Sequence, residues 1–150
     1  MVVRPAKHED RAPLMELMKG YFAFYRTPFP SDHKLGALLD ALEQDPDRGV
    51  QLVADADGRL QGFATLYACF DTLIADRILV MNDLFVDPSL RDRGLGAALF
   101  EACLAYATAN GYARLDWVTA AENHDARRFY ERHGGRSGPW VAYSMVPGSR

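Results

Sequence analysis

A glycine-spaced run of charged residues, Arg91 to Gly96 (RDRGLG), has the types and spacing that most directly suggest binding chemistry. It follows an apolar run that ends at Asp87-Pro88, and it precedes a long stretch with helical spacing. A helix N-terminus has unpaired N–H groups and a partial positive charge, and glycines at 94 and 96 have no side chain to keep an anion away. The run therefore predicts a site for a phosphate or pyrophosphate group.

Two polar residues, Asn82 and Asp83, interrupt the apolar stretch that comes before this run, at residues 77–86. Both faces of the stretch are mostly apolar, which is typical of a central strand. Strand alternation places Asn82 on one face, with Leu84 and Val86, and Asp83 on the other. Polar groups in a buried strand need a partner or a cavity, so both residues are candidates for a site.

A third candidate group lies in Asn123 to Gly134 (NHDARRFYERHG). Asn123 is a good N-cap for a short helix, which Gly134-Gly135 would end. Tyr130 falls on the inward face of that helix, where a tyrosine standing alone is read as a core residue.

The elements that must position these residues follow from apolar spacing. Asp57-Gly58 is a strong hairpin signal, so the strands beside it should be antiparallel. A strand, helix and strand in succession imply a parallel pair with a right-handed crossover. The expected elements are an edge strand at 2–5, a helix capped by Asp10, a helix ending at Asp45-Pro46, strands at 51–56, 60–70 and 77–86, a helix from Leu95 to Asn110-Gly111, a strand at 114–118, the helix after Asn123 and a strand at 140–146.

Length and composition bound the function. A chain of 150 residues, 49% of them apolar, is expected to form a single domain, 1–150. A net charge of −3 argues against nucleic acid as a partner, and the longest apolar runs are too short for a membrane span. Charges near the N-terminus argue against a signal peptide, so we expect a cytoplasmic protein. Cys69 and Cys103 lack metal-ligand spacing and are expected to be buried thiols.

Two other glycine-rich phosphate sites fit the run less well. A P-loop needs Gly-Lys-Ser/Thr at its end, which this chain lacks. A dinucleotide-binding fold needs a third glycine where Leu99 stands, and it is built on parallel strands.

The pattern Arg91-x-x-Gly94-x-Gly96, placed after a strand and opening a helix, resembles the acetyl-CoA pyrophosphate loop of the GCN5-related N-acetyltransferase (GNAT) superfamily. The order of elements is similar over nearly the whole chain, and residues 123–134 resemble the superfamily's Asn-x-x-Ala-x-x-x-Tyr helix. NDLFV at 82–86 and YFAFYRTP at 21–28 look most like the branch with the Hpa2-type yeast acetyltransferases, and less like spermidine/spermine acetyltransferases.

The resemblance implies an α/β (α+β) fold whose mixed, mostly antiparallel central sheet is splayed between its fourth and fifth strands and flanked by about four helices. It implies acetyl-CoA as the co-substrate, with no metal. The pantetheine arm would pair with one strand and the pyrophosphate would bind the loop. The implied cofactor-binding residues are Leu84, Phe85, Val86, Arg91, Arg93, Gly94, Leu95, Gly96, Ala97, Asn123 and Tyr130.

The implied activity is transfer of the acetyl group to a primary amine of a small molecule or a lysine side chain. Tyr130 matches the tyrosine that protonates the CoA sulfur, and Asn123 matches an asparagine that contacts the cofactor. The polyamine enzymes carry a glutamate where this chain has Asn82, which cannot act as a base. The base is left open between a water chain anchored on Asn82, Asp83 if a bulge re-aims it, and Glu122.

No cysteine has a histidine nearby in sequence, so the acetyl group should pass directly to the amine in a ternary complex. Two alternatives are a catalytically silent acyl-CoA-binding sensor and an interaction domain with a vestigial loop.

The aromatic segment at 21–30 is either core or the wall of an acceptor pocket. Arg26 would suit a carboxylate-bearing substrate or be solvated. Relatives of this type imply a homodimer, for which the apolar end at 140–146 is a candidate. The expected substrate-binding residues are Tyr25, Arg26, Phe29 and Asn82.

Overall fold

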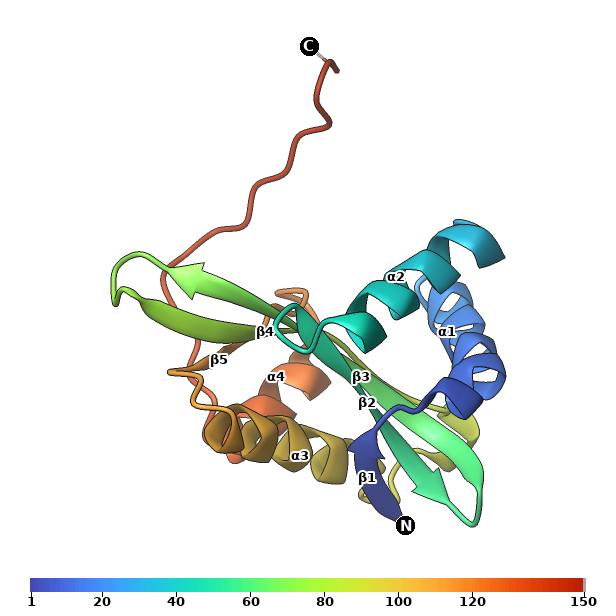
Figure 1. Cartoon of the computed structure of the whole chain (residues 1–150). Helices are drawn as coiled ribbons and strands as arrows, with labels where there is room; N and C mark the ends of the chain where they lie inside the picture. Colours follow the sequence, from blue (N-terminus) through green and yellow to red (C-terminus); the bar gives the residue numbers. More distant parts are fainter. Residues whose placement is uncertain (150) are drawn as a thin grey trace. The chain divides into compact units, whose positions relative to one another are not determined.

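Five strands form one mixed sheet in the computed structural model, which describes residues 1–149 (Figure 1). The spatial order follows the chain, from β1 to β5. Neighbours from β1 to β4 are antiparallel, and β4 and β5 are parallel. The strands are β1 (Val2–Pro5), β2 (Gly49–Ala56), β3 (Arg59–Asp71), β4 (Asp76–Val86) and β5 (Leu115–Asp116).

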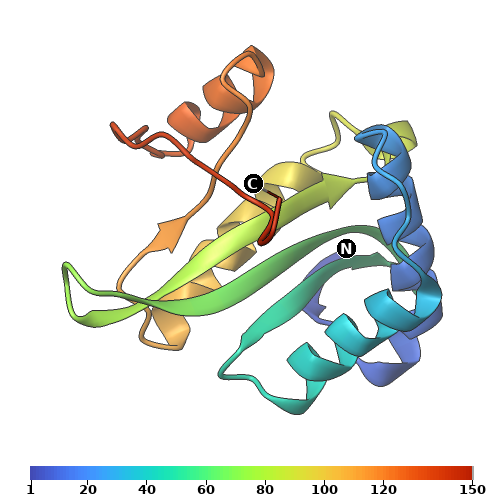
Figure 2. The same ribbon diagram turned by 90° about the horizontal axis from the view of Figure 1, so that it is seen from above.

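Helices cover both faces of this sheet. Figure 2 shows α1 and α2 on one side of the strands and α3 on the other. The core on the α1–α2 side joins Leu14 and Leu39 of the helices to Phe63 and Phe85 of the strands. The helices are η1 (His8–Asp10), α1 (Arg11–Phe24), α2 (Asp32–Gln44), η2 (Pro88–Leu90), α3 (Leu95–Ala109) and α4 (His124–Arg132).

The gap predicted between the fourth and fifth strands is confirmed. β5 pairs with β4 at only two positions, Leu79 with Leu115 and Val80 with Asp116. The expected strand at 114–118 is therefore shorter than its apolar pattern indicated. Within residues 1–149, the edge of β4 that faces away from β3 has no partner strand from Met81 to Val86.

A β-bulge at Asn82 corrects the predicted alternation of β4. Asp83 pairs with Thr65 and Met81 with the next residue, Leu66, so Asn82 is one residue more than β3 can match. Directly opposed residues share a face, and Phe63, Thr65 and Tyr67 lie on one face of β3. Asp83 and Phe85 therefore share a face with Val80, which the alternation had placed on the opposite side.

The chain divides into two compact units, Met1–Trp117 and Val118–Arg150. The sheet, α1, α2 and α3 belong to the first unit, and α4 belongs to the second. The strand expected at 140–146 is wrong, because these residues have no strand structure. The described part of the second unit contains no strand at all, and an extended segment becomes a strand only beside a hydrogen-bonded neighbour.

Candidate active site

The turn between β4 and α3 is held by local hydrogen bonds. The Asp87 carboxylate accepts bonds from the Ser89 hydroxyl at 2.7 Å and the Ser89 backbone N–H at 2.9 Å. These bonds from Ser89 lower the pKa of Asp87. Asp92 and Gly94 then adopt left-handed backbone angles, with φ of 64° and 78°. The turn thus has a defined shape that ends at the first residue of α3.

The start of α3 leaves space for a ligand. Gly94 is the N-cap and offers no side-chain acceptor to the N–H groups of the first turn. A Cβ added at Gly94 or Gly96 would meet no protein atom within 4 Å. The backbone angle at Gly96 does not require glycine. The lack of a side chain there therefore serves to leave room for a ligand next to the helix start. These features suit a bound anion.

The two arginines of the turn differ in their surroundings. The Arg91 guanidinium lies over the Phe24 ring, 4.4 Å from its centroid, at the end of α1. Arg93 is exposed. A cation–π contact restricts a long side chain while leaving its charge available, so Arg91 is held close to the loop.

The stretch Leu84 to Val86 can contact a ligand mainly through its backbone. The Phe85 ring is buried in the core, 5.7 Å from the Tyr21 ring and 5.8 Å from the Phe63 ring between centroids. At Gly62, opposite Val86, a Cβ would lie 2.7 Å from the Phe85 carbonyl oxygen, so only glycine allows this approach of β3. The core thus fixes the strand, and its unpaired edge stays available for an extended ligand.

A cavity of about 410 Å³ lies on the α1–α2 side of the sheet. It reaches the bulge, and both Asn82 and Asp83 border it. Tyr25 borders it too, whereas its neighbour Arg26 does not; Arg26 has a φ of 52° and is exposed. Phe29 packs instead against Phe22, with ring centroids 5.7 Å apart. The lining residues are Met18, Tyr21, Phe22, Tyr25, Thr27, Leu35, Leu38, Gln51, Phe63, Thr65, Tyr67, Asn82 and Asp83.

Asp83 is half-buried among uncharged partners. The Asn82 amide donates to its carboxylate at 3.1 Å. Burial first, then a hydrogen bond to Asp83 and the charge of Asp83, raise the pKa of Tyr21 far above its usual range. Burial and the same charge also raise the pKa of Tyr67. Both phenols therefore stay protonated at neutral pH, and neither neutralises the carboxylate.

A buried polar pair forms another part of the cavity wall. The Gln51 amide donates to the Thr65 hydroxyl at 2.9 Å, and both side chains are buried. Gln51, Thr65 and Tyr67 were not among the predicted site residues, whereas Tyr21 belongs to the aromatic segment that was expected to be either core or pocket wall. Thr65 and Tyr67 are polar residues at alternate positions of β3, so the sequence indicated that they share one face. Only the strand register, which pairs Thr65 with Gln51 and Asp83, shows that this face belongs to the cavity wall.

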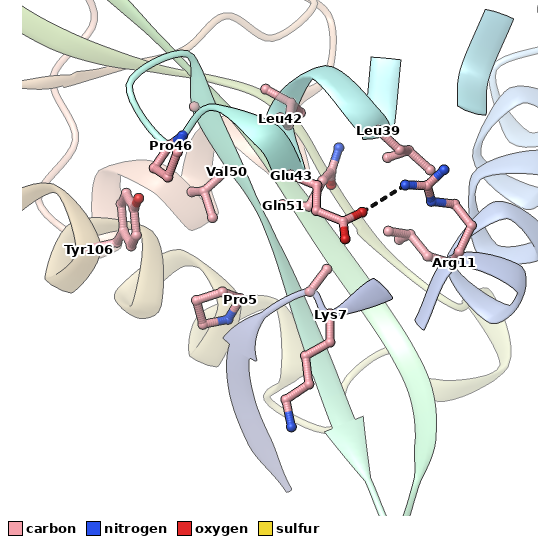
Figure 3. A pocket seen from close by; sticks show the side chains of 13 residues that line it. Pro5, Lys7, Arg11, Leu39, Leu42, Glu43, Pro46, Val50, Gln51 and Tyr106 are labelled. Carbon is pink, nitrogen blue, oxygen red and sulfur yellow. Dashed lines mark hydrogen bonds and ion pairs between the residues drawn. The ribbon is translucent and has the colours of Figure 1, made fainter. Parts of the chain in front are cut away.

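A second cavity, of about 300 Å³, lies beside the carboxyl end of α2 (Figure 3). The Arg11 guanidinium there donates to the Glu43 carboxylate at 2.9 Å and to Asp40 at 2.8 Å. Arg11 and Glu43 on its rim are thus paired with each other, and this cavity touches neither Asp83 nor the start of α3. We therefore place the candidate site at the first cavity.

The α4 helix carries the remaining predicted residues. The Asn123 side chain accepts a bond from the Ala126 N–H at 3.1 Å, which confirms it as the N-cap. Tyr130 is half-buried, with its ring centroid 5.3 Å from that of Phe129. Glu122 is exposed directly before the cap. The roles of these three residues toward a cofactor or substrate stay predictions.

The two cysteines differ in burial. Cys103 is buried, and burial raises the pKa of its thiol to about 12. Cys69, which was expected to be buried, is exposed toward the outer end of β3. Neither lines the cavity next to Asp83.

Within residues 1–149, no group of three or more His, Cys, Asp or Glu side chains could hold a metal ion. No helix in that range combines the length and apolar character that a membrane crossing needs.

Comparison with known proteins gives consistent matches. An uncharacterized N-acetyltransferase of Bacillus subtilis, YhfO, is 36% identical over 134 residues, 89% of each chain. The D-amino-acid N-acetyltransferase HPA3 of Saccharomyces cerevisiae is 26% identical over 133 residues, 88% of this chain and 83% of that one. The solved structure of a probable acetyltransferase matches with a TM-score of 0.85 and 25% identity over 100% of this chain and 99% of the other.

The yeast match agrees with the resemblance to the Hpa2-type branch. The sequence profile described as "Acetyltransferase (GNAT) family" matches residues 13–135, which include the loop, the bulge and α4. The chain belongs to the acetyltransferase (GNAT) family, as its sequence predicted.

Proposed function

We propose that this chain transfers the acetyl group of acetyl-CoA to a primary amine of a small molecule or a lysine side chain, by direct attack in a ternary complex. The observation that carries the proposal is the position of Asp83 beside the bulge at Asn82, where its carboxylate borders the cavity. The same strand continues directly into the unpaired edge and the loop before α3. Donor and acceptor would therefore meet at one strand.

Acetyl-CoA would be held by the backbone more than by side chains. The open space at Gly94 and Gly96 fits a pyrophosphate, and Arg91 and Arg93 add positive charge. Each dipole contact of this kind is worth about 0.3–1 kcal/mol, so several are needed together. The edge of β4 from Leu84 to Val86 would pair with the amides of the pantetheine arm.

The amine would bind as an ammonium beside Asp83 and must lose a proton to attack. We assign the proton to Asp83, because its carboxylate is the one charged group that borders the cavity among the described residues. A water chain anchored on Asn82 and a role for Glu122 are the remaining alternatives. The new C–N bond forms as the C–S bond breaks, and the leaving thiolate takes its proton from Tyr130.

Direct transfer is favoured over an acetylated enzyme. A covalent route needs a nucleophile that is ionised and close to the donor. Cys103 is buried with a pKa near 12, and Cys69 lies toward the end of β3 away from the loop. Within residues 1–149, neither thiol meets both requirements.

The test is acetyl-CoA consumption across a panel of primary amines, with release of free thiol and the mass of the product as readouts. We expect thiol release that depends on the amine, together with a product heavier by one acetyl group. Tight binding of acetyl-CoA with no turnover on any amine would instead favour the acyl-CoA sensor. The absence of any affinity for CoA would favour an interaction domain.

Three broader predictions belong to the same proposal. Residues 1–150 would act as one acetyltransferase domain, in the cytoplasm, and as a homodimer. Sedimentation of the full chain with and without CoA tests the dimer, since a monomer at every concentration would contradict it.

A further inference from the structure

We propose that the acceptor is a small primary amine on an apolar or aromatic body, with no carboxylate beside the amino group. This inference rests on the function proposed above and names the class of amine that the cavity takes. It follows from three features of the cavity wall: its rings, its single charge and its buried amide. A volume of about 410 Å³ suits a small molecule.

Aromatic rings form much of the wall. Tyr21 lies at their centre, with its ring centroid 5.0 Å from that of Tyr25 and 5.8 Å from that of Phe63. Phe22 and Tyr67 also border the cavity. The faces of such rings carry partial negative charge, which attracts an alkylammonium group, and their area accommodates an apolar body.

The wall carries one formal charge, the carboxylate of Asp83. No lysine, arginine or histidine of the described residues lines the cavity, and the partners of Asp83 are the amide of Asn82 and the phenol of Tyr21. An ammonium ion complements this charge. A carboxylate on the adjacent carbon, as in an amino acid, would lie close to Asp83 without a cation to balance it.

Gln51 and Thr65 offer neutral hydrogen bonds at some distance from Asp83. Gln51 pairs with Thr65, and Thr65 pairs with Asp83, so the three residues form a row across β2, β3 and β4. Strands lie about 4.8 Å apart, which puts Gln51 roughly 10 Å from Asp83 along this row. The amide of Gln51 keeps hydrogen-bonding capacity beyond its bond to Thr65. A hydroxyl or ether on the far side of the acceptor would fit there, whereas an ion would not.

A matched set of amines tests the inference on the full chain. The set contains 2-phenylethylamine, D- and L-phenylalanine, and phenylalaninamide, which keeps the size of the amino acid without its negative charge. We expect kcat/KM for 2-phenylethylamine to exceed that for either phenylalanine by about 100-fold, because like charges brought together are strongly disfavoured. Phenylalaninamide should fall much closer to the simple amine.

A substitution outside the chemistry tests the role of charge. Leu38 borders the cavity on α2 and is 38% exposed, so an arginine can be accommodated there. We expect Leu38→Arg to raise kcat/KM for phenylalanine at least about 10-fold relative to 2-phenylethylamine, since it supplies the missing cation. Leu38→Gln, which is polar but uncharged, is the matched control and should leave the ratio unchanged.

The outcomes separate this inference from the function on which it rests. Efficient acetylation of amino acids, with simple amines slower, would overturn the inference and leave the acetyltransferase intact. If other amines are acetylated but no alkylamine or aralkylamine is, the inference is likewise overturned and the acetyltransferase function remains. Binding of acetyl-CoA without turnover of any amine would overturn both proposals.

Discussion

The two sides of strand β4 present different chemistry to a ligand. Along the free edge of β4 and the turn that leads to α3, the site consists of backbone: an unpaired strand edge, a turn and a helix start with glycines at 94 and 96. On the cavity side, the site consists of side chains that come from α1, α2, β2, β3 and β4. The first arrangement suits a ligand shared by a whole family, and the second suits an acceptor that differs from member to member. Substitutions on the two sides should therefore have separable effects.

The largest effect is expected on the cavity side, from Asp83→Asn. Loss of the base should lower kcat/KM for the amine by about 100-fold or more, while the Kd of acetyl-CoA stays within a factor of about two. Steady-state kinetics and calorimetry measure the two quantities. Asp76→Asn, at the exposed outer end of the same strand, is the control for charge. Equal rates in the wild type and Asp83→Asn would transfer the role of base to a water chain or Glu122.

The next largest effect is expected from Tyr130, which belongs to the second unit. Tyr130→Phe removes the hydroxyl that would protonate the leaving thiolate, so kcat should fall by about 10- to 100-fold. Binding of acetyl-CoA should change little, because the ring remains. Full retention of kcat from neutral to alkaline pH would remove Tyr130 from the acid role.

A smaller effect is expected from the backbone side. Gly96→Val places a branched side chain into the space left open at the start of α3. The Kd of acetyl-CoA should rise by about 10-fold, in line with the loss of one or two contacts near a helix end. Gly36→Ala, at a position on α2 where a Cβ also meets nothing within 4 Å, is the matched control and should leave binding unchanged. Equal affinities for the three proteins would argue against a pyrophosphate site at this loop.

The smallest effect on activity is expected far from both sides, at Asp10. Its carboxylate accepts bonds from Arg4 at 2.6 Å and the Lys7 N–H at 2.7 Å, and the bond from Arg4 is the main cause that lowers the pKa of Asp10. Asp10→Asn should leave kcat unchanged and lower the free energy of unfolding by about 1–3 kcal/mol at neutral pH. Asp10 thus differs from Asp83, whose charge no cation of the described cavity wall balances.

The pH dependence of that stability follows from the direction of the shift. A carboxyl whose pKa is lowered by folding contributes stability above its unfolded pKa of about 3.9 and loses it as pH falls through the folded value. The difference between the wild type and Asp10→Asn in urea unfolding should therefore be largest at neutral pH and shrink below about pH 4. A constant difference at all pH values would show that the carboxylate charge is not responsible.

The backbone side could be predicted because its signals are local. Gly94 and Gly96 stand next to the strand and the helix that they connect, and Asn123 stands next to the helix that it caps. Such signals depend on a few neighbouring residues. These signals carried the resemblance to the family, and the resemblance in turn implied the splayed sheet.

The cavity side could be predicted only in part. The bulge at Asn82 depends on the register between β3 and β4, which alternation within one strand does not contain. Tyr25 borders the cavity while Arg26 does not, because the chain leaves α1 through a left-handed residue at Arg26. Gln51 and Thr65 can be recognised as part of the cavity wall only once the pairing of β2 with β3 is known. The expected strand at 140–146 was wrong for a related reason, since a strand is defined by its partner.

Initial-rate kinetics test whether donor and acceptor bind at the same time, the donor along the free edge of β4 and the acceptor in the cavity. Rates are measured with acetyl-CoA varied at several fixed concentrations of an amine that the panel identifies. We expect double-reciprocal lines that intersect, because both ligands must be present before the acetyl group moves. Parallel lines, the sign of a separate acetylated enzyme, would contradict it.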